Sequence, residues 1–193
     1  MKAMAAVLVV AAVAAATLAA AAGREVINEN FEGEQFPPAG WYIFYELGWW
    51  TRADGNGGYF ADGRGYASNG GELSYLYSNS FDLTSSGKVN IQFNYYTGED
   101  GYSGVNVREV HLERAGEKVW VDDFPTLTDW RHYDTTVGPF PKAPGYRLCF
   151  EVGAMGFNYY VHWCFFGVDD VYVRECYTAV APASLGRIKA LFR

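Results

Sequence analysis

The chain has 193 residues and a net charge of −7, which argues against binding to the nucleic-acid backbone. Aromatic residues make up 18% of the sequence and 22 residues are glycine, while helix-forming stretches are few. This composition predicts an all-β domain with many turns. An acidic, tyrosine-rich chain is compatible with divalent cations and with a glycan or protein partner.

The first segment, residues 1–22, is an apolar run rich in alanine that follows Lys2. A basic start, an apolar stretch and small residues at its end are typical of a secretory signal peptide. A membrane anchor is the alternative, because the run approaches a spanning length. We expect cleavage, since alanine makes the run weakly hydrophobic, and a protein that is secreted or held at the cell surface. Residues 23–177 then form one domain, and residues 178–193 form a tail, either a frayed terminus or a short amphipathic helix used for sorting or docking.

Short alternations of apolar and polar residues, separated by turn residues, run through the domain. In chain order they predict strands within residues 25–31, 41–45, 73–83, 88–97, 105–114, 118–121, 130–137, 146–152 and 160–174. In the fifth of these, Val110 and Leu112 fall out of step with Val105 and Val107, which predicts a bulge near Glu109. The number of strands and their spacing predict an antiparallel β-sandwich or jelly roll.

The last predicted strand carries two adjacent carboxylates, Asp169 and Asp170, among apolar residues. Neighbours in a strand point to opposite faces, so one of the two is expected to point inward or into a crowded sheet end. A buried carboxylate needs cations or several hydrogen-bond donors. This strand is therefore predicted to contribute to the core and to an ion site.

The three cysteines are Cys149, Cys164 and Cys176, and export would permit disulfides. If residues 146–152 and 160–166 form a hairpin, Cys149 lies opposite Cys164, which predicts a bridge between them. The alternatives are a bridge that involves Cys176, and three buried thiols.

Aromatic residues beside glycine-rich loops form the candidate ligand platform, because flat rings stack on sugar faces and glycine lets a ligand approach. The candidates are Trp41, Trp49, Trp50, Tyr59 and Tyr66. Trp41 is equally a candidate for the core. Trp49 and Trp50 are better candidates, since adjacent residues of an extended segment cannot both point inward.

The sequence shows no pattern typical of an enzyme. Glu109 and Glu113 do not belong to a Glu-x-Asp-x-x-Glu strand, and the three histidines are isolated from one another. There is no Gly-x-Ser-x-Gly elbow. We therefore interpret the chain as non-catalytic; a hydrolase of unfamiliar pattern is the weaker alternative.

Four segments, in the right order, resemble cleaved-adhesin and choice-of-anchor J domains, which are related to MAM domains. They are residues 30–41 (NFEGEQFPPAGW), 74–83 (SYLYSNSFDL), 88–96 and 163–173. Asn79 stands where these families usually have proline. The resemblance implies a jelly-roll sandwich of the galactose-binding or concanavalin-like kind, in an exported protein that acts in adhesion, carbohydrate binding or cell-surface assembly.

The resemblance also implies a structural Ca²⁺ between the first and last strands. Glu32 and Asp170 would share the ion with a loop oxygen, from Asp62 or from backbone carbonyls, because Ca²⁺ takes six to eight oxygen ligands. The alternative is that Glu32 and Asp170 cap sheet ends or pair with arginines.

Two functions are consistent with these features. The first is a secreted, non-catalytic module that binds an extracellular glycan or protein. The alternative is a structural or assembly protein of the cell surface or extracellular matrix with no small ligand.

Overall fold

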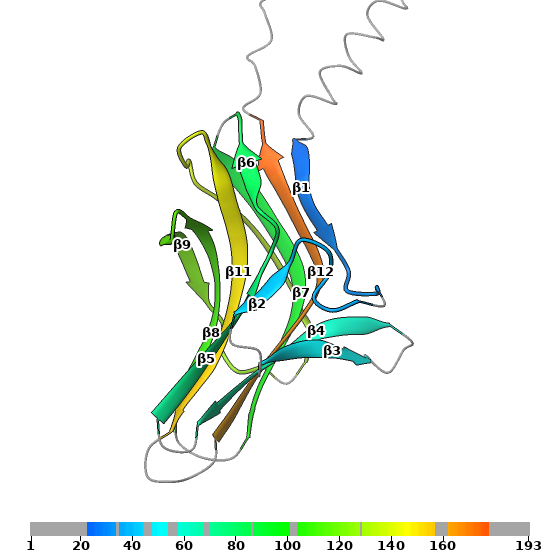
Figure 1. Cartoon of the computed structure of the whole chain (residues 1–193), viewed down its shortest axis with the longest axis vertical. Coiled ribbons are helices and arrows are strands. Elements are labelled where there is room, and N and C mark those ends of the chain that lie inside the picture. The colour runs from blue at the N-terminus through cyan, green and yellow to red at the C-terminus, as the bar shows by residue number, and fades with distance from the viewer. Residues whose placement is uncertain are drawn as a thin grey trace, which may run out of the picture.

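The computed structural model describes residues 23–177, except 34, 45–47, 54–57, 68–69, 86, 101–103, 128 and 157–161. The predicted signal peptide and C-terminal tail lie outside these residues. The described part of the chain forms twelve β-strands in two six-stranded sheets (Figure 1). It contains no helix that is long and apolar enough to cross a membrane.

Sheet A has the strand order β10-β7-β12-β4-β3, with β1 paired to β12. Its strands are β1 (Arg24–Glu29), β3 (Trp49–Ala53), β4 (Tyr59–Ala67), β7 (Lys88–Asp100), β10 (Arg131–Val137) and β12 (His162–Cys176). The pairing of β1 with β12 places the first and last strands side by side, as the family resemblance implied.

Sheet B has the order β2-β5-β11-β8-β9, with β6 paired to β11. Its strands are β2 (Tyr42–Phe44), β5 (Gly70–Tyr77), β6 (Phe81–Leu83), β8 (Gly104–Arg114), β9 (Glu117–Asp123) and β11 (Ala143–Gly156). The described pairings in both sheets are antiparallel, so the predicted all-β antiparallel sandwich is confirmed.

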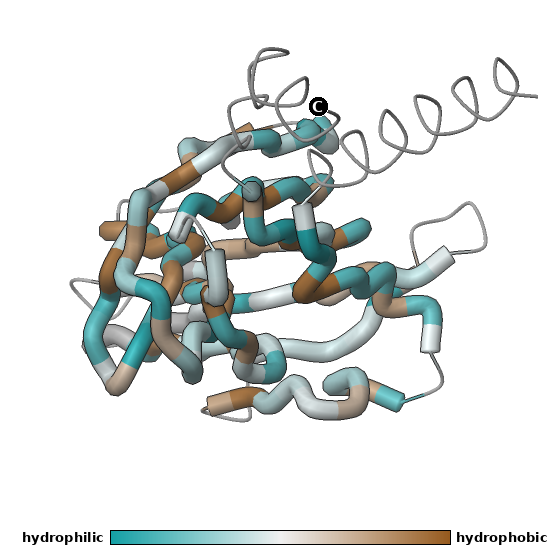
Figure 2. Tube along the Cα trace, turned by 90° about the horizontal axis from the view of Figure 1, so that it is seen from above, coloured by the Kyte–Doolittle hydropathy of each residue, from teal (hydrophilic) through white to brown (hydrophobic). Residues whose placement is uncertain are grey.

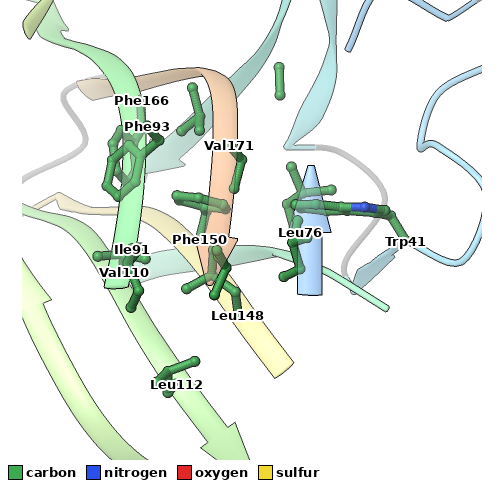
Figure 3. Close-up of a cluster of buried hydrophobic side chains, with 14 of the residues drawn as sticks. Trp41, Leu76, Ile91, Phe93, Val110, Leu112, Leu148, Phe150, Phe166 and Val171 are labelled. Atoms are coloured by element: carbon green, nitrogen blue, oxygen red, sulfur yellow. The ribbon is translucent and has the colours of Figure 1, made fainter. Parts of the chain in front are cut away.

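The core lies between the sheets and is built mainly by alternate residues of the longer strands, β7, β8, β11 and β12. Hydrophobic and hydrophilic residues alternate along much of the trace (Figure 2). The rings of Phe93, Phe150 and Phe166 meet at the centre, with Phe150 edge-on to Phe93 at 5.2 Å and 6.1 Å from Phe166 (Figure 3). Buried aromatic pairs of this geometry contribute both apolar area and edge-to-face attraction, so they tie the two sheets together.

A bulge in β12 corrects the prediction that Asp169 or Asp170 points inward. The register with β7 shifts between Asp169 and Tyr172, which inserts one residue into β12. Val168 and Val171 therefore both reach the core, although they are three residues apart. Asp170 occupies the bulge with a φ of 49° and is exposed.

The bulge predicted near Glu109 is absent, because β8 pairs with β11 in unbroken register from Gly104 to Arg114 and its pairing with β9 shifts only between Leu112 and Glu113. The apolar pattern was misleading, since Val105 is exposed and the inward position next to Val110 is taken by Arg108. The Arg108 guanidinium is buried and donates hydrogen bonds to the Phe124 and Gly98 carbonyls at 3.2 and 3.1 Å. A charged residue can therefore occupy an inward position at this end of the sandwich.

The predicted disulfide between Cys149 and Cys164 is wrong, because β11 and β12 do not form a hairpin. Cys149 lies in sheet B between Tyr77 and His111, and Cys164 lies in sheet A on the core side. Both thiols are free and buried. Burial raises the pKa of Cys164 to about 11.

Candidate functional site

The outer face of sheet B gathers aromatic and charged side chains from all five strands of its main path. The strands pair so that alternate residues form rows across the sheet, while Leu76, Phe150 and Val110 between them point into the core. The two main outward rows are Phe44–Tyr75–Glu151–Glu109 and Tyr42–Tyr77–Cys149–His111.

One side of this face is an aromatic ladder, formed by Phe44, Tyr75, Tyr42 and Tyr77. The Tyr42 and Tyr77 rings stack at 4.8 Å with an interplanar angle of 11°, and Tyr75 stacks on Tyr77 at 6.0 Å. Phe44 lies 6.1 Å from Tyr75 and is 51% exposed. The ladder is held by cross-strand contacts, so its rings are fixed in place before any ligand arrives.

Arg147 joins the ladder from β11. Its guanidinium lies 5.4 Å from the centre of the Tyr42 ring and donates a hydrogen bond of 3.0 Å to the Tyr42 hydroxyl. Burial raises the pKa of Tyr42, and Arg147 offsets part of the rise. Burial, with Cys149 and Glu113 nearby, also raises the pKa of Tyr77. Both hydroxyls are therefore protonated at neutral pH and able to donate or accept hydrogen bonds.

The other side of the face is a charged cluster, formed by Glu109, His111, Lys118 and Glu151. Glu109 and Glu151 are directly opposite in register, and the Lys118 ammonium bonds to both, at 2.7 Å from Glu151. The His111 Nδ1 atom lies 2.9 Å from Glu109 Oε1. Burial and, to a smaller extent, Lys118 lower the pKa of His111 to about 4 against the opposing effect of Glu151.

This combination suits the binding of a polyhydroxylated ligand. Exposed aromatic rings can stack on the apolar faces of sugar rings, and carboxylates and guanidinium groups beside them can bond to hydroxyl groups. Tyr42 and Phe44 on one edge strand of the face and Val121 on the other are exposed, whereas Cys149, His111 and Glu151 between them are buried.

The aromatic residues predicted from the sequence lie elsewhere. Trp49 and Trp41 are only 3% and 7% exposed and belong to the core, so neither is an exposed platform. Trp50 and Tyr59 lie on sheet A, where the Arg64 guanidinium lies over the Trp50 ring, 4.7 Å from its centre. Tyr66 lies in β4, but its side chain is outside the described part of the chain.

The three predicted calcium ligands are used differently. Asp62 is buried and its Oδ2 lies 3.0 Å from Arg64 and 3.7 Å from Arg52, so its charge is already compensated. Glu32 accepts a hydrogen bond of 2.8 Å from the Tyr59 N–H, and Asp170 accepts one of 2.9 Å from the Asn94 side-chain amide. Each of these carboxylates therefore accepts a hydrogen bond, and neither forms an ion pair with an arginine in the part of the chain that the structure describes.

The outer face of sheet B was missed, although the sequence contains a signal for it. In Tyr75-Leu76-Tyr77 the central leucine is fully buried, so both tyrosines must point outward. The charged residues of Glu109-Val110-His111 follow the same rule. What the sequence does not show is that β5 and β8 flank the same strand, β11.

No family model matches the sequence, and no curated protein matches it. Solved structures match the fold. The CBM22-1 xylan-binding domain of Paenibacillus barcinonensis Xyn10C has a TM-score of 0.51 at 13% identity, covering 82% of this chain and 98% of its own. The K1 cleaved-adhesin domain of Lys-gingipain from Porphyromonas gingivalis W83 has a TM-score of 0.49 at 14% identity, covering 77% and 96%.

The TmCBM61 module, solved with β-1,4-galactotriose, has a TM-score of 0.43 at 16% identity, covering 76% of this chain and 94% of its own. At these identities the likeness to CBM22-1 shows the fold alone. It agrees with the β-sandwich assigned from the strands of the molecule itself.

Proposed function

We propose that this chain is a non-catalytic β-sandwich module that binds a neutral glycan chain across the outer face of sheet B. The observation that carries the proposal is the aromatic ladder, in which four rings from two strands lie together on one solvent-facing surface beside polar groups. A pre-formed row of rings binds successive sugars with little loss of side-chain entropy.

A neutral glycan fits the charges of the face better than an acidic one. Glu109, Glu113 and Glu151 contribute three carboxylates, against the two cations Lys118 and Arg147. The whole chain is also acidic, with a net charge of −7. A uronic or sulfated glycan would meet repulsion here, whereas sugar hydroxyls can donate to the carboxylates.

The proposal includes export, which the apolar run of residues 1–22 supports. Glycan chains long enough to cross several rings are found outside the cell or at its surface. The fold shared with a xylan-binding domain is consistent with such a role.

The experiment that tests this function is isothermal titration with xylohexaose, β-1,4-galactotriose and cellohexaose. We expect at least one of these to bind, and Tyr42→Ala to weaken its Kd by about tenfold or more, a change of about 1.4 kcal/mol per factor of ten. Tyr59→Ala is the matched control, because Tyr59 is 47% exposed but lies on sheet A.

Equal losses in Tyr42→Ala and Tyr59→Ala would place binding elsewhere. A protein that binds none of these glycans and associates with itself would instead support the structural or assembly role.

For Ca²⁺ we propose a smaller ligand set than the sequence indicated, with Glu32 and Asp170 and without Asp62. The supporting observations are the pairing of β1 with β12 and the left-handed backbone at Phe31 and Asp170, with φ of 55° and 49°. Residues with a left-handed backbone cluster at ligand-binding sites. The ion would tie the end of β1 to the bulge in β12, and so stabilise the sandwich.

Thermal unfolding in excess EDTA and in millimolar Ca²⁺ tests this site. Binding at about one hundred times Kd adds roughly 2.7 kcal/mol, or a shift of several degrees. We expect Asp170→Asn to abolish the shift and Asp62→Asn to keep it. Identical wild-type melting curves in both buffers would exclude a stabilising Ca²⁺ site. Loss of the shift in Asp62→Asn would show that Asp62 is a ligand.

A further inference from the structure

In the charged cluster on sheet B, strand pairing places two carboxylates directly opposite each other. Glu109 and Glu151 face each other across β8 and β11, an arrangement that destabilises a sheet unless a cation lies between them. Glu151 is 5% exposed and Glu109 is 13% exposed, so water compensates little of their charge. The cation present is the Lys118 ammonium, which reaches across from β9 to Glu109 Oε1 and Glu151 Oε2.

Beside these two carboxylates, His111 supplies a third atom that could bind a metal ion. Its side chain is 1% exposed, and its Nδ1 faces the same two oxygens that Lys118 contacts, at 2.9 Å from Glu109 Oε1 and 3.8 Å from Glu151 Oε2. Although close to Glu109, Nδ1 has no hydrogen bond of acceptable geometry among the described residues. A buried, unpartnered ring nitrogen aimed at two carboxylate oxygens is the arrangement that a shared cation would satisfy.

We propose that Glu109, His111 and Glu151 form a binding site for a divalent transition-metal ion, for which Zn²⁺ is the natural probe. Their donor atoms all lie within 4.8 Å of one another. One imidazole nitrogen and two carboxylate oxygens form a three-ligand set that Zn²⁺ accepts, with a further position left for water or another ligand. Mg²⁺ and Ca²⁺ are disfavoured, since they prefer all-oxygen sites.

Lys118 is the competitor for this site rather than an obstacle to it. Its side chain is 41% exposed and begins on β9, the edge strand, so the ammonium can leave toward solvent without moving the sheet. A divalent metal ion places two positive charges beside the carboxylates, whereas the Lys118 ammonium places one.

The surroundings hold the imidazole in position. The Tyr77 ring lies edge-on to the His111 ring, with centres 6.5 Å apart. On the other side, Val121 of β9 is the register partner of His111. A ring fixed in this way does not have to be ordered by the metal, which favours binding. The site stands on these contacts and does not depend on glycan binding.

The test is Zn²⁺ titration of the protein by calorimetry, with the bound metal counted after gel filtration. We expect one equivalent of Zn²⁺, with binding lost in His111→Gln. Lys118→Met removes the competing charge and keeps an unbranched side chain of similar length. In this variant we expect Zn²⁺ to bind about tenfold tighter or more. His132→Ala, on sheet A, is the matched control for surface binding and should leave the affinity unchanged.

Cobalt substitution checks the donor atoms, because Cys149 is the register partner of His111. Visible absorption of the Co²⁺ form should show ligand-field bands without a thiolate charge-transfer band. A thiolate band would overturn the assigned ligands. Zn²⁺ binding that survives in His111→Gln, that fails to tighten in Lys118→Met, or that is absent from both the wild type and Lys118→Met would overturn the site itself.

Discussion

At the scale of single residues, Glu175 shows how the sandwich accommodates a fully buried carboxylate. Its oxygens accept hydrogen bonds from the Thr84 N–H at 2.6 Å and the Ser85 hydroxyl at 2.9 Å, and Arg24 lies 3.1 Å away. Burial opposes ionisation, but the hydrogen bonds from Ser85 and Thr84 outweigh it and lower the pKa of Glu175 from its usual 4.5. The charged form is therefore the one that the fold stabilises.

This arrangement predicts a stability that depends on pH. Because the pKa of Glu175 is lower in the folded state, its contribution is complete above pH 4.5 and is lost as the pH falls through the folded-state pKa. Glu175→Gln should lower the free energy of unfolding at neutral pH by about 1–3 kcal/mol and flatten the acid limb of the profile. Urea unfolding across the acid range measures both, with the exposed Glu117→Gln as control. An acid limb unchanged in Glu175→Gln would contradict this role.

The residues that sequence reasoning placed correctly are those decided by local pattern. The alternation in β7 put Val89, Ile91 and Phe93 on one face, and all three are fully buried. Trp49 was misplaced because tryptophan suits a core and a sugar platform equally well; here its ring packs on Gly63, where an added Cβ would lie 2.7 Å from it. The expectation that Asp169 or Asp170 points inward was wrong because a bulge breaks the alternation in β12.

At the scale of elements, the sequence predicts that most of the strands exist, but it does not predict which sheet each strand joins or which strands it pairs with. β11 and β12 are consecutive, and a hairpin was the expected connection. Instead β11 pairs with β5 and β8, while β12 pairs with β4 and β7. Such long-range pairing depends on the packing of the whole domain, so neither the free cysteines nor the outer face of sheet B could be derived from local patterns.

One close approach between strands of opposite sheets is specified by glycine. A Cβ on Gly65 of β4 would lie 2.5 Å from the backbone of Gly153 in β11. Backbone atoms cannot move as a side chain can, so Gly65→Ala should lower the free energy of unfolding by about 1–3 kcal/mol through overpacking. Thermal unfolding measures the loss.

Gly98→Ala is the matched control for Gly65→Ala, because the nearest atom to its Cβ is the mobile Tyr96 hydroxyl at 3.2 Å. If both variants melted at the wild-type temperature, the proposed contact between the two sheets would be wrong.

At the scale of the whole molecule, the two outer faces of the sandwich differ in what they leave available. On sheet A, Asn90 and Gln92 donate hydrogen bonds to Asp134, so this polar row is largely satisfied within the protein. Beside sheet A, Trp130, which directly precedes β10, is 41% exposed and belongs to a smaller group of three rings, edge-on to Phe60 at 5.0 Å and 6.1 Å from Tyr96. Sheet B presents an extended ladder of rings beside charged groups, and this contrast favours sheet B as the binding face.

The most direct test of that assignment is a ¹H–¹⁵N correlation spectrum recorded during titration with xylohexaose, β-1,4-galactotriose and cellohexaose. We expect a bound glycan to shift amide signals of β2, β5 and β11, with the largest changes around Tyr42 and Tyr77, and to leave β10 unchanged. Shifts centred on Trp130 and β10, or spectra unaffected by any of these glycans, would contradict the binding face proposed for this molecule.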